Sequence, residues 1–338
     1  MTNKVQPLLT IDGLSVAFHT PEGVGRAVDD VGFVLQKGET LGLVGESGCG
    51  KSVTALSVMG LIESPPGRIA GGRIDFDGRN LLALSAEKLR RIRGRDMAMI
   101  FQEPMTSLNP VLTIGRQVAE PLMLHKEMNR SRAFREALVW LDYVKIPAAR
   151  QRLSDYPHQL SGGMRQRVMI AMAMVCRPRL LIADEPTTAL DVSIQSQILS
   201  LMEGLKRDFG MSLLLITHDL GVVAQMAARV VVMYAGQVVE TADTDTLFKS
   251  AFHPYSRGLM RSIPRLGSRA GGARRRLVEI PGTVPSLLEM VPGCRFAGRC
   301  PEVFERCRSE RPVLETIADG HQVRCWLTAH SERRTVHA

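Results

Sequence analysis

The sequence lacks any long hydrophobic run. Its longest uninterrupted apolar stretch covers nine residues, 168–176, whereas a helix that crosses a membrane needs about 20. No apolar core follows the first four residues either, so we expect no secretory signal peptide and no membrane span. With 45% hydrophobic and 23% charged residues among 338, the composition is that of a folded globular protein, which excludes a disordered chain, a collagen and a small disulfide scaffold.

Aromatic residues are also scarce, at 5% of the chain. Positive charge is plentiful: 43 Lys and Arg stand against 34 Asp and Glu, and 15 Arg against 8 acidic residues fall within residues 251–338. A basic tail is typical of proteins that bind nucleic acid, anionic lipid or an acidic protein, but also of a plain solvated surface. Because this tail does not interleave aromatic side chains that could stack on bases, we expect no nucleic-acid partner.

Apolar periodicity predicts alternating strands and helices up to about residue 250. Strands are expected at residues 8–18, 27–35, 40–44, 97–101, 180–183 and 212–217, with hairpins at 72–80 and 230–241. Helices are expected at residues 51–61, 114–146, 165–176, 194–209 and 220–228. This alternation indicates an α/β core around a largely parallel sheet. Beyond it Pro, Gly and Arg interrupt the pattern, so we expect a first domain at residues 1–250 and an irregular C-terminal extension at 251–338.

One loop has the composition of a phosphate-binding site. Residues 45–52 read GESGCGKS, match the pattern G-x-x-x-x-G-K-S/T, and lie between a predicted strand and a predicted helix. In such loops backbone N–H groups face phosphate oxygens, the Lys reaches the β- and γ-phosphates, and the Ser ligates Mg²⁺. A structural glycine turn is the alternative, and the strand–loop–helix context argues against it. The residues expected to hold the nucleotide here are Gly45, Ser47, Gly48, Gly50, Lys51 and Ser52.

An apolar strand further along the chain ends in two acids, Asp184 and Glu185. In an α/β sheet, an acid at the carboxyl end of a strand lies beside the phosphate loop, where Asp184 can hold Mg²⁺. Glu185 is then placed to polarise a water that attacks the γ-phosphate. A strand followed by an acid is a weak signal by itself and a strong one after a phosphate loop.

The segment LSGGMRQR occupies residues 160–167. Ser161 could simply cap the helix that follows, yet two glycines at a helix start also make an anion site. With Ser161 lying 23 residues before Asp184, the segment resembles the signature motif of ABC-transporter ATPases. The resemblance covers about residues 8–250. It implies an α/β P-loop NTPase of the ABC type with an antiparallel β lobe and a helical subdomain at about residues 103–160. In that family the signature, here Ser161 and Gly163, completes the nucleotide site of the opposite subunit.

Other positions of this family are filled in the same order. Gln102 resembles the Q-loop glutamine, which contacts Mg²⁺ and water and senses the membrane partner. Asp191 resembles the D-loop aspartate, and His218 resembles the switch histidine that contacts the γ-phosphate. Phe18 falls where the family stacks an aromatic ring on adenine, with a place in the core as the alternative. The resemblance thus implies ATP and Mg²⁺ as cofactors.

The tail narrows the resemblance. The segments HPY (253–255), IPGTVP (280–285), GCRF (293–296) and RCP (299–301), with MTSLNP at 105–110, are similar to the dipeptide and oligopeptide importer ATPases, nearest to the D-type dipeptide subunit. This implies an ATPase that powers import of di- or oligopeptides, with a nickel or glutathione importer as the alternative. It also implies two membrane permeases, a second, related ATPase subunit and an extracytoplasmic solute-binding protein. The expected location is peripheral, on the cytoplasmic face of a bacterial inner membrane.

Four of the six cysteines crowd near the C-terminus: Cys294, Cys300, Cys307 and Cys325. In a reducing compartment such a group binds metal more often than it forms disulfides. The spacing C-x5-C-x6-C-x17-C has no C-x2-C pair, which counts against an ordinary zinc ribbon. A 4Fe–4S cluster, zinc or free thiols therefore remain open from the residues alone. The resemblance implies the cluster, because related importer ATPases carry one in this region.

Two rival functions fit less well. A soluble ABC ATPase that acts on nucleic acid or ribosomes would be expected to carry two cassettes or a long coiled coil, but only about 57 residues separate Gln102 from Leu160. A non-catalytic scaffold would be expected to have lost Lys51, Glu185 or His218, and the chain retains all three.

Overall fold

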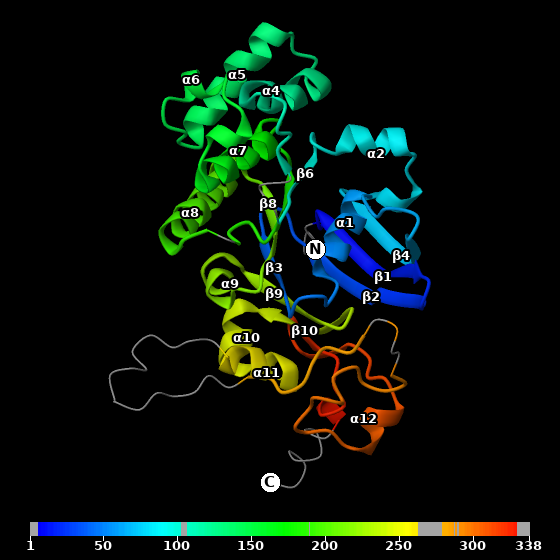
Figure 1. Cartoon of the computed structure of the whole chain (residues 1–338). Coiled ribbons are helices and arrows are strands. Elements are labelled where there is room, and N and C mark those ends of the chain that lie inside the picture. The colour runs from blue at the N-terminus through cyan, green and yellow to red at the C-terminus, as the bar shows by residue number, and fades with distance from the viewer. Residues whose placement is uncertain are drawn as a thin grey trace, which may run out of the picture. The chain divides into compact units, whose positions relative to one another are not determined.

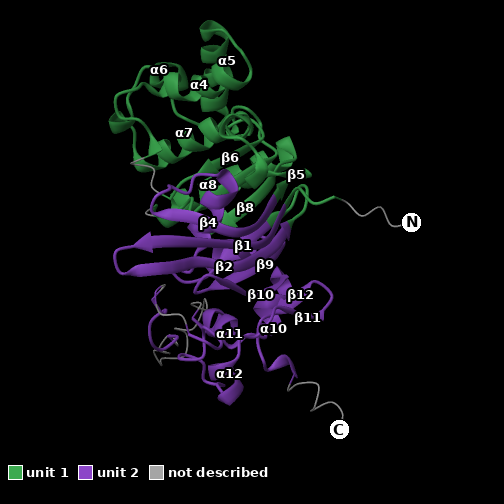
Figure 2. Ribbon diagram, turned by 90° about the vertical axis from the view of Figure 1, so that its right-hand side faces the viewer, with its two compact units in different colours: residues 1–9, 35–40, 75–216 green, residues 10–34, 41–74, 217–338 purple. Residues whose placement is uncertain are grey.

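The computed structural model describes residues 6–102, 107–188, 190–262, 279–286, 288 and 291–329. The chain forms two compact units whose segments alternate along the sequence (Figure 2). The first unit comprises Met1–Leu9, Leu35–Thr40 and Asp75–Ile216, and the second comprises Thr10–Val34, Leu41–Ile74 and Thr217–Ala338. No helix in the described part of the chain is long and apolar enough to cross a membrane.

Three parallel strands form the centre of the first unit: β6 (Met97–Ile100), β7 (Leu180–Asp184) and β8 (Ser212–Ile216). β7 pairs with both of the others, in parallel. Every residue of β7 and β8 is buried, as in parallel sheets covered on both faces. Parallel strands need crossover connections, and the helices α7 (Gly162–Met174) and α8 (Val192–Phe209) precede β7 and β8. The strands and helices predicted for this part of the chain are confirmed.

The described residues of the first unit form further helices. They are α2 (Ala86–Ile92), α4 (Ile114–His125), α5 (Arg130–Tyr143), α6 (Ala149–Arg152) and the 3-10 turns Leu81–Ala83 and Pro157–Gln159. The single helix predicted at 114–146 is wrong. The chain turns between α4 and α5, where Glu127 has φ of +51° and Asn129 caps α5 by accepting from the Arg132 N–H. Apolar spacing continues across this turn, so periodicity alone could not separate the two helices. α2 has one buried residue, Ile92, and therefore gave no apolar stripe to detect.

A β lobe opens the second unit. Its strands lie in the order β2 (Gly23–Leu35), β1 (Leu9–Thr20), β4 (Gly67–Phe76). β1 and β2 are neighbours joined by two residues and therefore run antiparallel. β4 continues into the first unit, where Asp75 and Phe76 pair antiparallel with β5 (Arg79–Asn80). These observations agree with the predicted antiparallel lobe and hairpin.

The second unit also contains a mixed sheet built on β3 (Thr40–Val44). β3 runs parallel to β9 (Arg229–Tyr234), and antiparallel strands follow in the order β10 (Gln237–Asp243), β12 (His321–Val323) and β11 (Glu315–Ala318). The helices are α1 (Lys51–Met59), α9 (Leu220–Met226), α10 (Thr244–Ser250), α11 (Pro254–Arg261) and α12 (Glu305–Ser309), as labelled in Figure 1 where there is room.

The C-terminal extension, predicted to be an irregular region, also contains short regular elements. It adds two strands to the sheet and packs into the core of the second unit. β12 is only three residues long and β11 is exposed along its whole length, so neither carried an alternating apolar signal. Aromatic rings from the extension, Tyr255 and Phe296, meet Tyr234 of β9 with ring centroids 4.7 and 5.1 Å from it, distances at which aromatic pairs stabilise a core.

Candidate active site and cysteine site

The predicted site residues fall into two groups, one in each unit. The first unit contains Gln102, Ser161, Gly163, Asp184, Glu185 and Asp191. The second unit contains Phe18, Gly45, Ser47, Gly48, Gly50, Lys51, Ser52, His218 and the cysteines Cys294, Cys300, Cys307 and Cys325. Part of the predicted MTSLNP motif, Met105 and Thr106, lies outside the described residues, as does Ala189 beside the predicted D-loop.

The phosphate loop joins β3 to α1 as predicted. Gly45 and Gly50 have φ of +150° and +100°, and a Cβ at these positions would lie 2.2 Å from the Met233 carbonyl oxygen and 2.5 Å from the Ala27 carbonyl oxygen. Only glycine fits both constraints. The loop therefore turns tightly and delivers the N-terminus of α1, with Gly50 as its N-cap, to the place where an anion can bind.

Lys51 begins α1 and is buried, with 5% of its surface exposed. Its Nζ donates to the backbone carbonyl oxygens of Gly45 at 2.8 Å and Glu46 at 3.0 Å. The ammonium group thus lies across the loop that it belongs to, where a bound phosphate could take over these hydrogen bonds. Ser52 follows it on the same helical turn and is partly exposed.

Glu46, inside the phosphate loop, contacts the C-terminal extension of the same unit. Its backbone N–H donates to Tyr255 Oη at 2.8 Å. Its carboxylate accepts two hydrogen bonds from Arg299, from Nη1 at 2.6 Å and from Nη2 at 3.0 Å. A carboxylate that accepts from both Nη atoms of one arginine forms the bidentate, charge-assisted arrangement that is strongest among protein ion pairs.

His218 is exposed, two residues after β8 and just before α9. Asp219, next to it, caps α9 by accepting from the N–H groups of Gly221 and Val222. His218 lines a cavity of about 530 Å³ together with Gly45, Glu46, Arg299 and the segment 279–284. The predicted switch histidine, one end of the phosphate loop and part of the extension thus surround one open space in the second unit.

Asp184 and Glu185 stand at the carboxyl end of β7. Asp184 is buried, with 3% of its surface exposed. The Glu185 carboxylate Oε2 accepts hydrogen bonds from Gln102 Nε2 at 3.1 Å and from Thr188 Oγ1 at 2.8 Å. Two residues predicted to be catalytic, Gln102 and Glu185, are therefore in direct contact. The two donors orient the carboxylate that is predicted to polarise water.

The LSGGM segment forms the start of α7. Ser161 caps this helix by accepting from the Met164 N–H at 3.3 Å, which is the local role that any Ser at such a position could take. Gly163 lies against α8, where a Cβ would come 2.9 Å from Ile194 Cγ2. Asp191 in turn caps α8, and its hydrogen bonds from Ser193 and Ile194 lower the pKa of its carboxyl.

Phe18, predicted to stack on adenine, lies near the end of β1 and is half-buried. One edge of its ring faces Gly67, where a Cβ would come 3.0 Å from Cε1. A ring that is part buried and part exposed is compatible with both the adenine-stacking and the core alternatives.

The four cysteines of the extension are brought together. Cys294, Cys300, Cys307 and Cys325 all line one small pocket, with His253 and Trp326 among its other walls. All four are free thiols. Burial raises the pKa of Cys294 to about 11 and that of Cys325 to about 12. Within the described residues, no group of three or more His, Cys, Asp or Glu is spaced to hold a metal ion.

Comparisons with known proteins agree with this arrangement. Residues 28–188 match the family model described as ABC transporter, and residues 239–307 match the one described as oligopeptide/dipeptide transporter, C-terminal region. The "Probable peptide ABC transporter ATP-binding protein y4tR" of Sinorhizobium fredii is 52% identical over 96% of each chain. The "Oligopeptide transport ATP-binding protein AppD" of Bacillus subtilis is 51% identical over 95% of this chain and 96% of its own.

The chain belongs to the ATP-binding subunits of peptide-importing ABC transporters. Among solved structures, the dimeric post-hydrolysis cassette MJ0796 bound to ADP and Pi has a TM-score of 0.63 at 27% identity and covers 70% of this chain and 98% of its own. The predicted family, the predicted ABC cassette fold and the predicted role as an ATPase of peptide import are confirmed.

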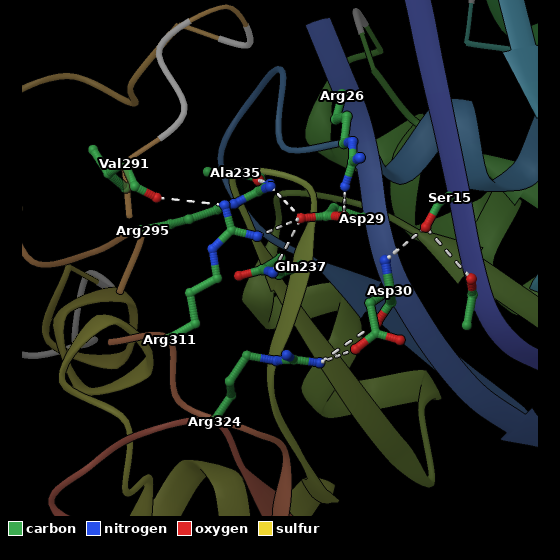
Figure 3. Close-up of polar contacts among 11 residues, drawn as sticks. Ser15, Arg26, Asp29, Asp30, Ala235, Gln237, Val291, Arg295, Arg311 and Arg324 are labelled. Atoms are coloured by element: carbon green, nitrogen blue, oxygen red, sulfur yellow. Dashed lines mark hydrogen bonds and ion pairs between the residues drawn. The ribbon is translucent and has the colours of Figure 1, made fainter. Parts of the chain in front are cut away.

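Arginines of the extension hold this importer subunit's second unit together (Figure 3). Asp29 of β2 accepts from Arg26 at 3.2 Å, from Arg311 at 3.4 Å and from Arg295, which also donates to the Ala235 carbonyl. Arg324 donates to the carboxylate of Asp30 at 3.2 Å. The extension is thus fixed to the β lobe by charge-assisted hydrogen bonds.

Sequence reasoning missed several residues that the importer fold places at the site. Tyr255 and Arg299 contact Glu46 in the phosphate loop although they lie 209 and 253 positions after it along the chain. Gln166, in the signature helix, donates from Nε2 to the Pro186 carbonyl just after Glu185, at 2.6 Å. The HPY and RCP motifs contained two of these residues, but no local pattern tells which distant side chain they contact.

Proposed function

We propose that the chain binds MgATP on its phosphate loop and hydrolyses it to power import of di- or oligopeptides. The observation that supports this most is that relatives named for peptide transport match nearly the whole chain, including the extension. Ser52, Gln102 and Asp184 are the residues that would hold Mg²⁺, which supplies charge neutralisation on the phosphates. Lys51 would hold the β- and γ-phosphates, Phe18 would stack on adenine and His218 would contact the γ-phosphate.

In this proposal Glu185 is the general base for the attacking water. Its support is geometric: a carboxylate directly after β7, oriented by hydrogen bonds from Gln102 and Thr188. Because Gln102 contacts Glu185 and also begins the segment that faces the membrane partner in this family, it can link the position of the base to the state of the permeases.

A Glu185→Gln variant tests the assignment. It keeps the hydrogen-bonding shape but cannot accept a proton, so we expect hydrolysis in the assembled transporter to fall about a hundredfold or more, with MgATP binding retained. Thr188→Val is the matched variant, because it removes one orienting donor and leaves the base in place. Thr188→Val should lower turnover less than Glu185→Gln does. Near-normal turnover of Glu185→Gln would contradict the assignment.

The proposed assembly contains two permeases, a second, related ATPase and an extracytoplasmic solute-binding protein. Ser161, Gly163 and Asp191 would complete the nucleotide site of the second ATPase. A pair of cassettes is supported by the solved structure that this fold resembles, which is dimeric. The chain would divide into an ATPase domain at 1–250 and an extension at 251–338. It would lie on the cytoplasmic face of the bacterial inner membrane.

We also propose that Cys294, Cys300, Cys307 and Cys325 hold one 4Fe–4S cluster with a structural role. The support is that all four cysteines line the same pocket. The thiols would have to move closer together on binding, since no three of the described His, Cys, Asp and Glu side chains are spaced for a metal ion as they stand. Three of the four cysteines are also next in sequence to an arginine that donates hydrogen bonds to a carboxylate outside the extension. These pairs are Arg295 with Asp29, Arg299 with Glu46 and Arg324 with Asp30. When bound, such a cluster supplies iron–thiolate bonds whose binding energy becomes folding energy. Fixing the four cysteines would fix the three arginines.

Iron analysis of the anaerobically purified chain tests this proposal. We expect about four iron atoms per chain, lost in Cys300→Ser together with increased protease sensitivity of the extension. Cys176→Ser is the matched control, since Cys176 is buried outside the pocket. Zinc in place of iron would overturn the cluster. No metal, with a protease-resistant extension, would overturn any metal site.

A further inference from the structure

An acidic side chain inside a phosphate-binding loop is an electrostatic problem. Glu46 lies directly after Gly45, and its own carbonyl oxygen accepts from the Nζ of Lys51 at 3.0 Å. Its carboxylate is 28% exposed. An unpaired carboxylate here would repel the polyphosphate that the loop must hold, because like charges interact strongly where water is partly excluded.

Arg299 forms an ion pair with the Glu46 carboxylate. Its side chain is only 8% exposed, and both Nη atoms bind the Glu46 carboxylate. The remaining donors are also engaged: Nε donates to the Pro281 carbonyl at 2.8 Å and Nη2 to the Ile280 carbonyl at 3.1 Å. The guanidinium packs over the Tyr234 ring, 5.7 Å from its centroid. The hydrogen bond to Glu46 raises the pKa of Arg299, so its charge is permanent.

We propose that Arg299 is a positioning residue of the nucleotide site: it neutralises the Glu46 carboxylate of the phosphate loop and so permits tight binding of the ATP polyphosphate. The extension is then part of the ATP site rather than an appendage to it. The same guanidinium holds the backbone of the segment 279–284, which shares a cavity with Gly45 and His218. This inference rests on the proposed role of residues 45–52 in binding ATP.

The alternative is that Arg299 merely cross-links the extension to the loop. The two readings differ in the effect of removing Glu46 as well. If neutralisation is the role, Arg299→Gln leaves a bare carboxylate near the phosphates, and the added change Glu46→Gln removes that repulsion. If the role is a cross-link, the double variant is as defective as the single one, since the link is broken in both.

The experiment is a titration of the full-length chain with the non-hydrolysable analogue AMP-PNP and Mg²⁺. We expect Arg299→Gln to raise Kd about tenfold, which corresponds to about 1.4 kcal/mol, and Arg299→Gln with Glu46→Gln to recover most of that loss. The ratio of Kd between Arg299→Gln and the wild type should shrink as salt rises from 50 to 500 mM, about a threefold shorter screening length. In the assembled transporter, Arg299→Gln should lower kcat less than it lowers kcat/KM, because saturating ATP compensates for weaker binding.

Arg324→Gln is the matched control. Arg324 also neighbours a cysteine and pairs with a carboxylate of the same unit, Asp30, but contacts no residue of the phosphate loop in the described structure. It should leave the Kd within about twofold of the wild type while loosening the extension. An unchanged Kd in Arg299→Gln, or no recovery in the double variant, would overturn the inference. Failure of the wild type to bind the analogue would instead overturn the proposed role of the loop.

Discussion

Ion pairs between single charged residues connect segments of the second unit that are far apart in the sequence. Asp29, Asp30 and Glu46 each bind an arginine of the extension, and in each pair the arginine side chain is at most 10% exposed, although that of Asp30 is 66% exposed. Surface pairs contribute little, up to about 1 kcal/mol. A pair with one buried member costs much more to break, because the remaining charge is left without its partner. Single substitutions here should therefore have effects well beyond the local surface.

His125, at the end of α4, makes the stability of the first unit depend on pH. Burial lowers the pKa of its imidazole, and the charge of Arg95 adds to this. A Cβ at Gly94 would lie 2.9 Å from its Nε2, so the ring is closely covered. Between the lowered pKa of the folded state and the unfolded pKa of about 6.5, the unfolded chain binds a proton that the folded chain does not. Stability from this group is therefore complete above that pH and is lost as pH falls through it.

We expect His125→Gln to lose less stability than the wild type between pH 7.5 and pH 5. The two proteins should differ in this loss of unfolding free energy by at most about 1.4 kcal/mol for each unit by which folding lowers the pKa of His125. Thermal unfolding of both proteins at the two pH values measures it. A wild type whose midpoint falls no more steeply than that of His125→Gln would show that the imidazole is not coupled to folding.

At the scale of elements, the sequence predicted the helices, strands and loops that are determined by residues close together in the chain. The strand β3, the glycine loop and α1 were found because a buried strand, a fixed spacing of glycines and a Lys-Ser pair all lie within 13 residues, 40–52. β7 with Asp184 and Glu185 was found in the same way. The turn between α4 and α5 was missed because the left-handed φ of Glu127 is not preceded or followed by a strong breaker.

Elements stabilised by distant contacts could not be predicted. β12 pairs with β11 close by, and it joins the main sheet because Val323 and Gln322 pair with Glu240 and Thr241, some 80 positions earlier. Glu240 is fully buried and receives the N–H groups of Phe252 and His253, which fixes the start of α11. From the sequence alone, a polar residue in a short strand is predicted to be exposed. Glu240 is buried because the N–H groups of Phe252 and His253 satisfy its carboxylate. The roles of the predicted site residues stay predictions, and the contact of Gln102 with Glu185 is what the structure adds to them.

At the scale of the whole molecule, the ATPase is expected to need a second cassette. Ser161 and Gly163 lie at the start of α7 in the first unit, and in the proposed assembly they would complete the nucleotide site of an opposite subunit. The resembled cassette bound to ADP and Pi is dimeric. Under this proposal the γ-phosphate of an isolated chain would lack donors that stabilise charge in the transition state, and loss of such a donor costs about a hundredfold or more in rate.

We therefore expect the isolated chain, as a monomer, to hydrolyse ATP about a hundredfold more slowly per chain than the assembled transporter. The rate per chain should rise with protein concentration or on addition of the second ATPase, since either supplies the missing signature. Light scattering in the same buffer establishes the oligomeric state of each sample. Where the gain comes from a second copy of this chain, Ser161→Arg should remove it, whereas Val192→Ala, at an exposed position of α8, should retain it. Turnover at the level of the full complex from a demonstrably monomeric sample would mean that one chain builds a complete site by itself.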